Sequence, residues 1–287
     1  MRYLGFILLM ALFFVACNKD ETEIVKNNTA PIDSTINITI VETYINRSYI
    51  SLLGRKPDSA EFSNAFQTLK QNNTSVAQRN LFIQSIFTKT DYNKQLFDIN
   101  HIDLLNQVDT NEFEDKIMLF NFLLTDSTYA PFWSVFTLEL NRIFNLQNAI
   151  AKLQQNQISI QQLHMVMVDN YFYDQINMGA LNFVTSLYQH FLRRYPTVQE
   201  LDAGIDMVND KPATVFQQNG SNKNDFIFIF FNATDYYEGQ VRDLYLRYLF
   251  REPTTAEMVT LTNQYKSQKN YKNIQQYILT SDEYLGK

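Results

Sequence analysis

Three arginine–glutamate pairs are the residues whose types and spacing could do chemistry in this sequence. In each, a glutamate follows an arginine by six positions, with a proline and then an Asp or Thr between them. The twelve residues are Arg55, Pro57, Asp58 and Glu61; Arg194, Pro196, Thr197 and Glu200; and Arg251, Pro253, Thr254 and Glu257. A guanidinium can bind an anion with two hydrogen bonds, and a glutamate can act as the acid in glycoside cleavage.

A structural explanation fits the same spacing, and we favour it. Proline lacks an amide donor and ends the helix before it. The next residue, Asp or Thr, is of the N-cap type, and a glutamate three positions later completes a capping box. An arginine in the last turn of the preceding helix would complement the helix dipole and could reach the glutamate. We therefore expect three structural corners and no catalytic residue, with a triplicated anion site as the alternative.

The histidines do not suggest a metal centre. His101, His164 and His190 are isolated, and none has the spacing that puts two ligands on one helix face. The sequence also lacks a nucleophile elbow, a P-loop and a dinucleotide fingerprint. A net charge of −6, without a basic block, argues against nucleic-acid binding. We expect a protein that is not an enzyme and binds no metal, cofactor or nucleic acid.

The corners belong to a longer repeat. SYISLLGRKPDSAEF, LYQHFLRRYPTVQEL and LYLRYLFREPTTAEM share a Tyr and a Leu four positions apart, which places both on one helix face. Downstream of each, IFTKTDY, FFNATDY and ILTSDEY end an apolar helix with an acidic residue and a tyrosine. Only 7 glycines and 6 prolines are available for turns, which favours helices over sheets. The predicted fold is all-α, with helix–corner–helix units stacked into one array.

The repeat also sets the predicted boundaries. We place helical units at 41–95, 183–240 and 241–287. The segment 96–182 has a helical pattern without the corner motif, so we interpret it as a degenerate unit whose corner has been lost or rebuilt. QNGSNKND, at 218–225, is predicted to be an inserted loop with its turn at Asn219-Gly220.

The N-terminus predicts export. MRYLGFILLMALFFVAC has a basic start, an apolar run and a cysteine after a small residue, and it resembles a bacterial lipoprotein signal. We expect a signal peptide at 1–16, lipidation of Cys17 and a flexible tether over 17–40; an uncleaved anchor is the alternative. NKDE after the cysteine resembles the export signal of Bacteroidota-type lipoproteins. It implies an outer-membrane lipoprotein, exposed on the cell surface and held by acyl chains.

The first corner carries a family resemblance. YISLLGRKPDSAEF, together with the TSDEY ending of the chain, resembles a small helical module of bacterial extracellular proteins. LYLRYLFREPTTAEM is similar to corners of uncharacterised domains in large bacterial surface proteins, and phycobilisome linker domains show a fainter likeness. The resemblance implies a surface-protein scaffold, and no enzyme activity comes with it.

Two aromatic clusters are candidate ligand contacts. Tyr171 and Tyr173 in NYFYDQ, and Tyr236 and Tyr237 in DYYEGQ, lie beside amides and carboxylates, a mixture that suits stacking on sugars or peptide binding. The competing interpretation, which we favour, is that a tyrosine with a buried ring closes each unit, because it recurs with the repeat.

The expected function is therefore a non-enzymatic, lipid-anchored surface scaffold that presents a helical array to another cell-envelope protein. The alternative is a glycan-binding accessory lipoprotein of an outer-membrane uptake system. Exposed coplanar aromatics beside carboxylates in one groove would favour the glycan alternative, whereas a broad apolar patch would favour the scaffold. A cleft with a pair of carboxylates, or a histidine paired with one, would favour an enzyme.

Overall fold

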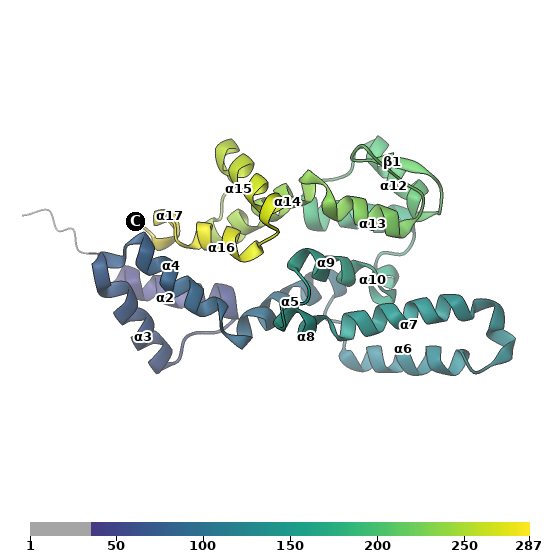
Figure 1. Cartoon of the computed structure of the whole chain (residues 1–287), viewed down its shortest axis with the longest axis horizontal. Coiled ribbons are helices and arrows are strands. Elements are labelled where there is room, and N and C mark those ends of the chain that lie inside the picture. Colours follow the sequence, from purple (N-terminus) through teal and green to yellow (C-terminus); the bar gives the residue numbers. More distant parts are fainter. Residues whose placement is uncertain (1–35) are drawn as a thin grey trace, which may run out of the picture. The chain divides into compact units, whose positions relative to one another are not determined.

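Helices form most of the chain, as the apolar spacing predicts. The computed structural model describes residues 36–287, in which the two short strands β1 and β2 form the only sheet, so the all-α prediction is confirmed (Figure 1). Cys17, the predicted signal peptide and most of the predicted tether lie outside the described residues.

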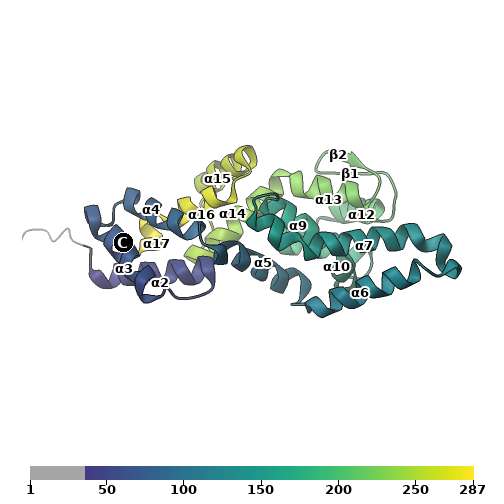
Figure 2. The ribbon, with the colours of Figure 1, turned by 60° about the horizontal axis from the view of Figure 1, so that its bottom comes forward.

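The elements follow one another with short connections (Figures 1 and 2). The first are α2 (Ile38–Leu53), α3 (Ser59–Lys70), η2 (Gln71–Thr74), α4 (Val76–Phe87) and α5 (Thr90–Leu105). Next come α6 (Thr110–Leu123), η3 (Ser127–Phe132), α7 (Trp133–Gln147), α8 (Ala149–Gln154), α9 (Ile160–Val168) and α10 (Tyr171–Ile176). The last are α11 (Ala180–Leu187), the π-helical turn η4 (Tyr188–Leu192), α12 (Val198–Val208), β1 (Ala213–Val215), β2 (Gln218–Gly220), α13 (Lys223–Asn232), α14 (Thr234–Leu249), α15 (Thr255–Gln268), α16 (Tyr271–Leu279) and α17 (Asp282–Leu285).

The three corners have the same backbone design. The helix before each corner ends in a left-handed residue, which is Gly54 (φ 70°), Arg193 (φ 55°) or Phe250 (φ 56°). The helices after them, α3, α12 and α15, each begin with a complete capping box. Because such a cap contributes about 1 kcal/mol, it fixes where the second helix starts. The predicted capping boxes are confirmed.

The placement of the arginines within a helical turn is wrong. Arg55, Arg194 and Arg251 each follow the left-handed residue, so they lie just beyond the preceding helix and not in its last turn. The left-handed residue reverses the chain direction before the arginine is reached, which the pattern of side chains did not reveal.

The left-handed position gives a testable difference between the first and third corners. We expect Phe250→Gly to raise the free energy of unfolding by about 0.5–1 kcal/mol, because glycine adopts positive φ without the steric cost that an L side chain meets. The Phe250 ring is 81% exposed, so little packing is lost. Urea denaturation checks this result. Phe250→Ala is the control, since it removes the ring and keeps the strain, and equal stability of the two variants would contradict the explanation.

A fourth junction in the middle segment resembles these corners. LLNQVDTNEF, at 104–113, aligns with LLGRKPDSAEF, at 52–62, when one residue is deleted from the latter. Asn106 is left-handed (φ 50°), Asp109 caps α6, and Glu112 stands in its first turn. Gln107 takes the place of the arginine and no proline is present. This junction keeps the left-handed residue and the cap but has no arginine for the ion pair, and the interpretation of segment 96–182 as a degenerate unit stays a prediction.

The first and last predicted units pack against each other. Tyr44 of α2 donates a hydrogen bond to the carbonyl oxygen of Leu279 (2.9 Å). Arg79 of α4 donates to the carbonyl oxygen of Ser281 (3.0 Å) and to the carboxylate of Asp282 (2.7 Å). The stacking of all units into one array stays a prediction.

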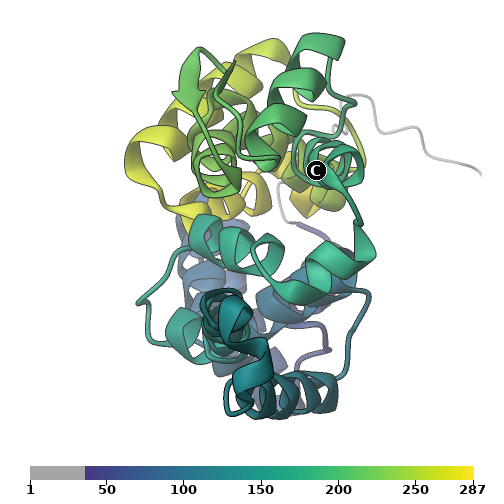
Figure 3. The same cartoon turned by 90° about the vertical axis from the view of Figure 1, so that its right-hand side faces the viewer.

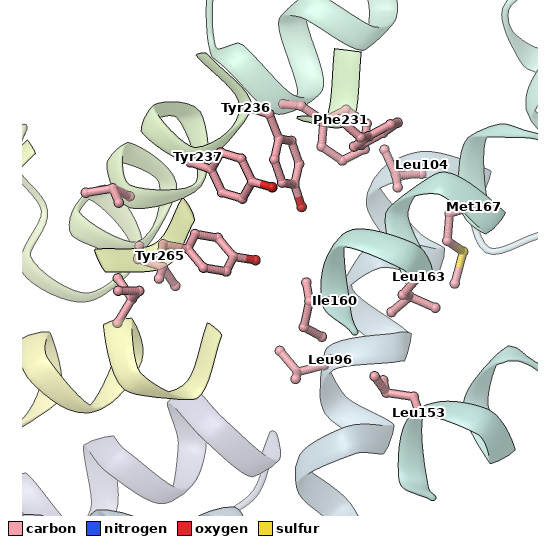
Figure 4. Packing of buried hydrophobic residues seen from close by; sticks show 14 of the residues in the cluster. Leu96, Leu104, Leu153, Ile160, Leu163, Met167, Phe231, Tyr236, Tyr237 and Tyr265 are labelled. Carbon is pink, nitrogen blue, oxygen red and sulfur yellow. The ribbon is translucent and has the colours of Figure 1, made fainter. Parts of the chain in front are cut away.

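The core is rich in aromatic rings. Figure 4 shows Tyr236 and Tyr237 of α14 facing the side of the core that Leu163 of α9 lines. The rings of Phe191 and Phe231 have centroids 4.9 Å apart at 74°, an edge-to-face contact. These side chains come from η4, α9, α13 and α14, so the core joins segments that are distant in the sequence.

The predicted inserted loop, 218–225, contains strand β2, a two-residue link and the start of α13, and β2 forms a β-hairpin with β1. β1 and β2 pair antiparallel, with Ala213 opposite Gly220. The turn lies at Phe216 and Gln217, which have φ of 48° and 60°, and not at Asn219-Gly220, where we predicted it. Two residues with positive φ form the tight turn whose twist matches paired strands, so strand pairing overrode the turn preference of Asn-Gly. In Figure 3 these green strands and the teal helices α6 and α7 lie at opposite edges of the view.

Candidate functional site

Each corner arginine binds its capping glutamate through two hydrogen bonds. The distances from Nη1 and Nη2 are 2.7 and 3.0 Å for Arg55–Glu61, 2.8 and 2.7 Å for Arg194–Glu200, and 2.9 and 2.8 Å for Arg251–Glu257. The predicted contact between the arginine and the glutamate is therefore confirmed in all three corners.

A second carboxylate, which the sequence reasoning did not connect to the corners, completes each ion cluster. It belongs to the residue immediately before the closing tyrosine. The pairs are Arg55–Asp91 (2.7 Å), Arg194–Asp235 (2.9 Å) and Arg251–Glu283 (2.7 Å). Each guanidinium thus links the corner to the closing helix of its own unit. This arrangement favours the structural interpretation over a triplicated anion site.

The electrostatics of the corners also oppose an acid role for the glutamates. The hydrogen bond from Arg251 lowers the pKa of Glu257 to about 2, and the hydrogen bond from Arg55 lowers the pKa of Glu61 well below its usual value. For Glu200, burial raises the pKa, but the hydrogen bonds from Arg194 and Thr197 outweigh it and the pKa is lowered. A carboxylate that stays ionised cannot supply the proton that glycoside cleavage requires.

The tyrosines proposed as ligand contacts are mostly buried, so that proposal is wrong for three of the four. Tyr173, Tyr236 and Tyr237 have exposed fractions of 0%. Tyr173 and Tyr236 occupy the third position of α10 and α14, a position that faces the core. Tyr92, Tyr236 and Tyr284, the tyrosines of the three closing motifs, are likewise buried, as the favoured interpretation expects.

Tyr171 is the remaining candidate and is half-buried. Its ring packs edge-on against Phe120 of α6 at 5.9 Å, and the ammonium group of Lys116 lies 4.8 Å from its centre. The ring therefore already has partners on both sides within the protein, which leaves little of it for a ligand.

One cavity contains two of the three histidines. It has a volume of about 370 Å³ and is lined by His164, His190, Asp103 and Asp243, among others. Asp243 is bound by Arg193 and by Arg247 (3.1 Å). His164 instead bonds the Tyr236 hydroxyl through Nδ1 at 2.8 Å. Because no hydrogen bond joins a histidine to a carboxylate in the described cavity, the base and orienting group of a nucleophilic site are not assembled there.

A second cavity tests the glycan alternative. It has a volume of about 610 Å³ and lies among α4, α14, α15 and α16, where the Tyr277 ring is 52% exposed. Its three carboxylates are all ion-paired: Asp282 with Arg79, and Glu257 and Glu283 with Arg251. The cavity offers one exposed ring, and not the set of coplanar rings that the glycan alternative calls for.

Across residues 36–287, no three His, Cys, Asp or Glu side chains gather closely enough to hold a metal ion. Within the same range, none of the helices is both long and apolar enough to cross a membrane.

The most unusual surface lies on the hairpin of α6, η3 and α7. We define the hairpin tip by its exposed apolar side chains: Met118, Leu119, Phe122, Tyr129, Phe132, Trp133, Val135 and Leu138. Between Ile117 and Leu138 the only charged residue is Asp126. Such a continuous apolar surface is rare on a soluble protein unless it binds something.

The hairpin tip is ordered by contacts of its own. Phe136 of α7 stacks on Phe120 of α6 with centroids 5.9 Å apart, and the indole nitrogen of Trp133 donates to the carbonyl oxygen of Leu123 (3.1 Å). Asp126 is used as a cap, because its carboxylate accepts from the amide of Thr128. The rings are thus held outward by a folded hairpin. A run of 22 residues with a single charge was the signal in the sequence.

Comparison with known proteins gave no match: no family model fits the chain, and neither a curated protein nor a solved structure resembles it at a significant level. The resemblance of the corners to modules of bacterial surface proteins therefore stays a prediction.

Proposed function

We propose that this protein is a non-enzymatic, lipid-anchored scaffold that docks another cell-envelope protein through the hairpin tip. The observation that carries the proposal is the exposure of eight large apolar side chains around one charge. Phe122 is 64% exposed, Phe132 56% and Met118 67%. Fully burying one such side chain contributes about 1.5–3 kcal/mol, so a few of them suffice for a specific complex.

The composition of the tip indicates the kind of partner. Aromatic residues and methionine are enriched at the centres of protein interfaces, whereas Lys, Glu and Asp are depleted there. The tip has Phe, Tyr, Trp and Met and no basic residue. A surface without cations has no electrostatic attraction to anionic lipid headgroups, so we favour a protein with an apolar groove over a membrane.

The rest of the chain supports this role by fixing the position of the tip. α7 packs on α8, α9 and α10, whereas α6 packs chiefly on α7, so the hairpin is supported at its base and free at its end (Figure 1). The corners lock the remaining helices through their caps and ion pairs. In the proposed location, acyl chains on Cys17 hold the protein at the outer membrane and the tether supplies reach.

Photo-crosslinking tests the docking. We expect a photoreactive phenylalanine analogue at Phe132, in the full chain expressed in its native cells, to give one reproducible crosslinked protein. Phe132→Asp should lower recovery of that protein by at least about 10-fold, because it removes a buried ring and places a charge in an apolar interface.

Tyr195 provides the matched control, since its ring is 72% exposed and lies at the second corner, away from the tip. The analogue at Tyr195 should give no such adduct, and Tyr195→Asp should leave recovery unchanged. Crosslinking to lipid alone, or equal recovery with Phe132→Asp, would refute the proposed docking.

A further inference from the structure

A third cavity differs from the others in its charge. It has a volume of about 510 Å³ and is bordered by the ends of α8 and α15 and the starts of α9 and α16. Lys269 and Lys272 line it, and none of its described lining residues is acidic. In a protein with a net charge of −6, a concave site with two cations and no carboxylate is unexpected.

The two lysines have no counter-charge. The ammonium group of Lys272 lies 4.9 Å from the centre of the Tyr92 ring, and the described residues offer it no carboxylate partner. Lys269 donates to the hydroxyl of Tyr237. Partial burial lowers the pKa of both lysines, and no neighbouring acid opposes that effect. Two partly desolvated cations lining one cavity without a carboxylate are unfavourable, and an anion bound in the cavity would offset that cost.

The neutral groups around the lysines are amides with unused hydrogen-bonding atoms. Gln162 accepts from the amide of Ser159, and Gln268 accepts from Asn273, so both keep their NH2 donors. Asn93 donates to the carbonyl oxygen of Leu153 and keeps its own oxygen as an acceptor. Donors and acceptors on amide side chains suit hydroxyl groups, which are both.

We propose that this cavity binds an acidic saccharide, with the carboxylate or sulfate of the sugar between Lys269 and Lys272 and its hydroxyl groups on the surrounding amides. The site is separate from the hairpin tip, so the proposal does not depend on the proposed docking function. It assigns the glycan partner, which the sequence only suggested, to the junction of α9, α15 and α16, and it requires no exposed aromatic ring.

Calorimetric titration of the full chain in detergent tests the assignment. The probes are digalacturonate, a sulfated heparin disaccharide, neutral lactose and inorganic sulfate. We expect at least one acidic disaccharide to bind more tightly than lactose and sulfate by about 10-fold or more, since a charge-assisted contact adds to the hydroxyl contacts. Lys272→Met should weaken that binding by about 10-fold, and Lys272→Arg should retain it.

Lys56→Met is the matched control, because it removes the same charge from an exposed site outside the cavity. Circular dichroism confirms that each variant is folded before it is titrated. Equal binding of lactose, no binding of either acidic disaccharide, or an equal loss with Lys56→Met would overturn the proposal. If inorganic sulfate binds as tightly as the sugars, the cavity binds an adventitious ion only, and the proposal is also overturned.

Discussion

Replacing Gly239 with alanine is expected to destabilise the protein by about 3 kcal/mol. Gly239 lies inside α14, where glycine is normally unfavourable because of its backbone freedom. A Cβ at this position would lie 1.9 Å from the carbonyl oxygen of Phe191 and 3.0 Å from the Cα of Leu192. Both atoms are backbone atoms of the π-helical turn η4, so they cannot move aside as a side chain would. The cost of this steric clash should exceed the gain in helix propensity from glycine to alanine, which is about 1 kcal/mol.

Thermal and urea unfolding measure this effect, and for a protein of this size the midpoint should fall by about 6–12 °C. Glu238→Ala is the control, since it places the same alanine one position earlier in α14, on a partly exposed surface. It should shift the midpoint by no more than about 2 °C. If Gly239→Ala unfolds no earlier than Glu238→Ala, the close approach of α14 to η4 does not exist in solution.

The corners were predictable because their chemistry is local. Proline, an N-cap residue and a glutamate three positions later act on the same helix start, so their spacing alone indicates the structure. The same locality explains the failure at the arginines. The left-handed residue before each one is Gly54, Arg193 or Phe250, and two of these three are residue types that rarely adopt positive φ. Their side chains gave no indication of it.

Contacts between distant segments could not be read from the spacing. Asp91 follows Arg55 by 36 positions, and Glu283 follows Arg251 by 32. Both acids were recognised as parts of a closing motif, but only the folded chain brings them to the arginines. The fourth junction was missed for a different reason, since the loss of one residue between Gln107 and Asp109 breaks the fixed spacing while the cap survives.

The hairpin tip and the tyrosines show the limit for functional residues. Buried and exposed aromatic residues are of the same types, so the sequence alone does not distinguish them. The position of a residue in its helix determines whether its ring is buried. Tyr236 follows the start of α14 by two positions and enters the core, whereas Phe122 and Phe132 lie at the exposed end of the hairpin. The run from 117 to 138 with a single charge was visible in the sequence, but a buried helix would show such a run too.

Acidification below pH 6.5 is expected to destabilise the protein through His164. The imidazole is buried, with 4% exposed, and burial lowers its pKa to about 3. In the unfolded chain the pKa is about 6.5, so between pH 6.5 and 3 the unfolded state binds a proton that the folded state refuses. Stability therefore rises with pH in this window, and it falls on acidification by up to about 1.4 kcal/mol per pH unit. Above pH 6.5 both states are neutral and the effect vanishes.

Urea denaturation between pH 5 and 6.5 separates this effect from that of glutamates such as Glu61 and Glu257, whose lowered pKa values contribute only when the pH falls toward their unfolded pKa of about 4.5. Burial also lowers the pKa of His101 and His190, so both add to the slope in this window and the His164→Gln variant identifies the share of His164. In the His164→Gln variant, the slope of the unfolding free energy against pH should fall by the equivalent of nearly one bound proton. This change is expected whatever the stability of the variant at pH 7. Tyr236→Phe removes the hydrogen bond to His164 and keeps the histidine buried, so the slope should remain. An unchanged slope in His164→Gln, or a flattened one in Tyr236→Phe, would mean that burial of this imidazole is not the cause, since the loss of solvent is the largest influence on its pKa.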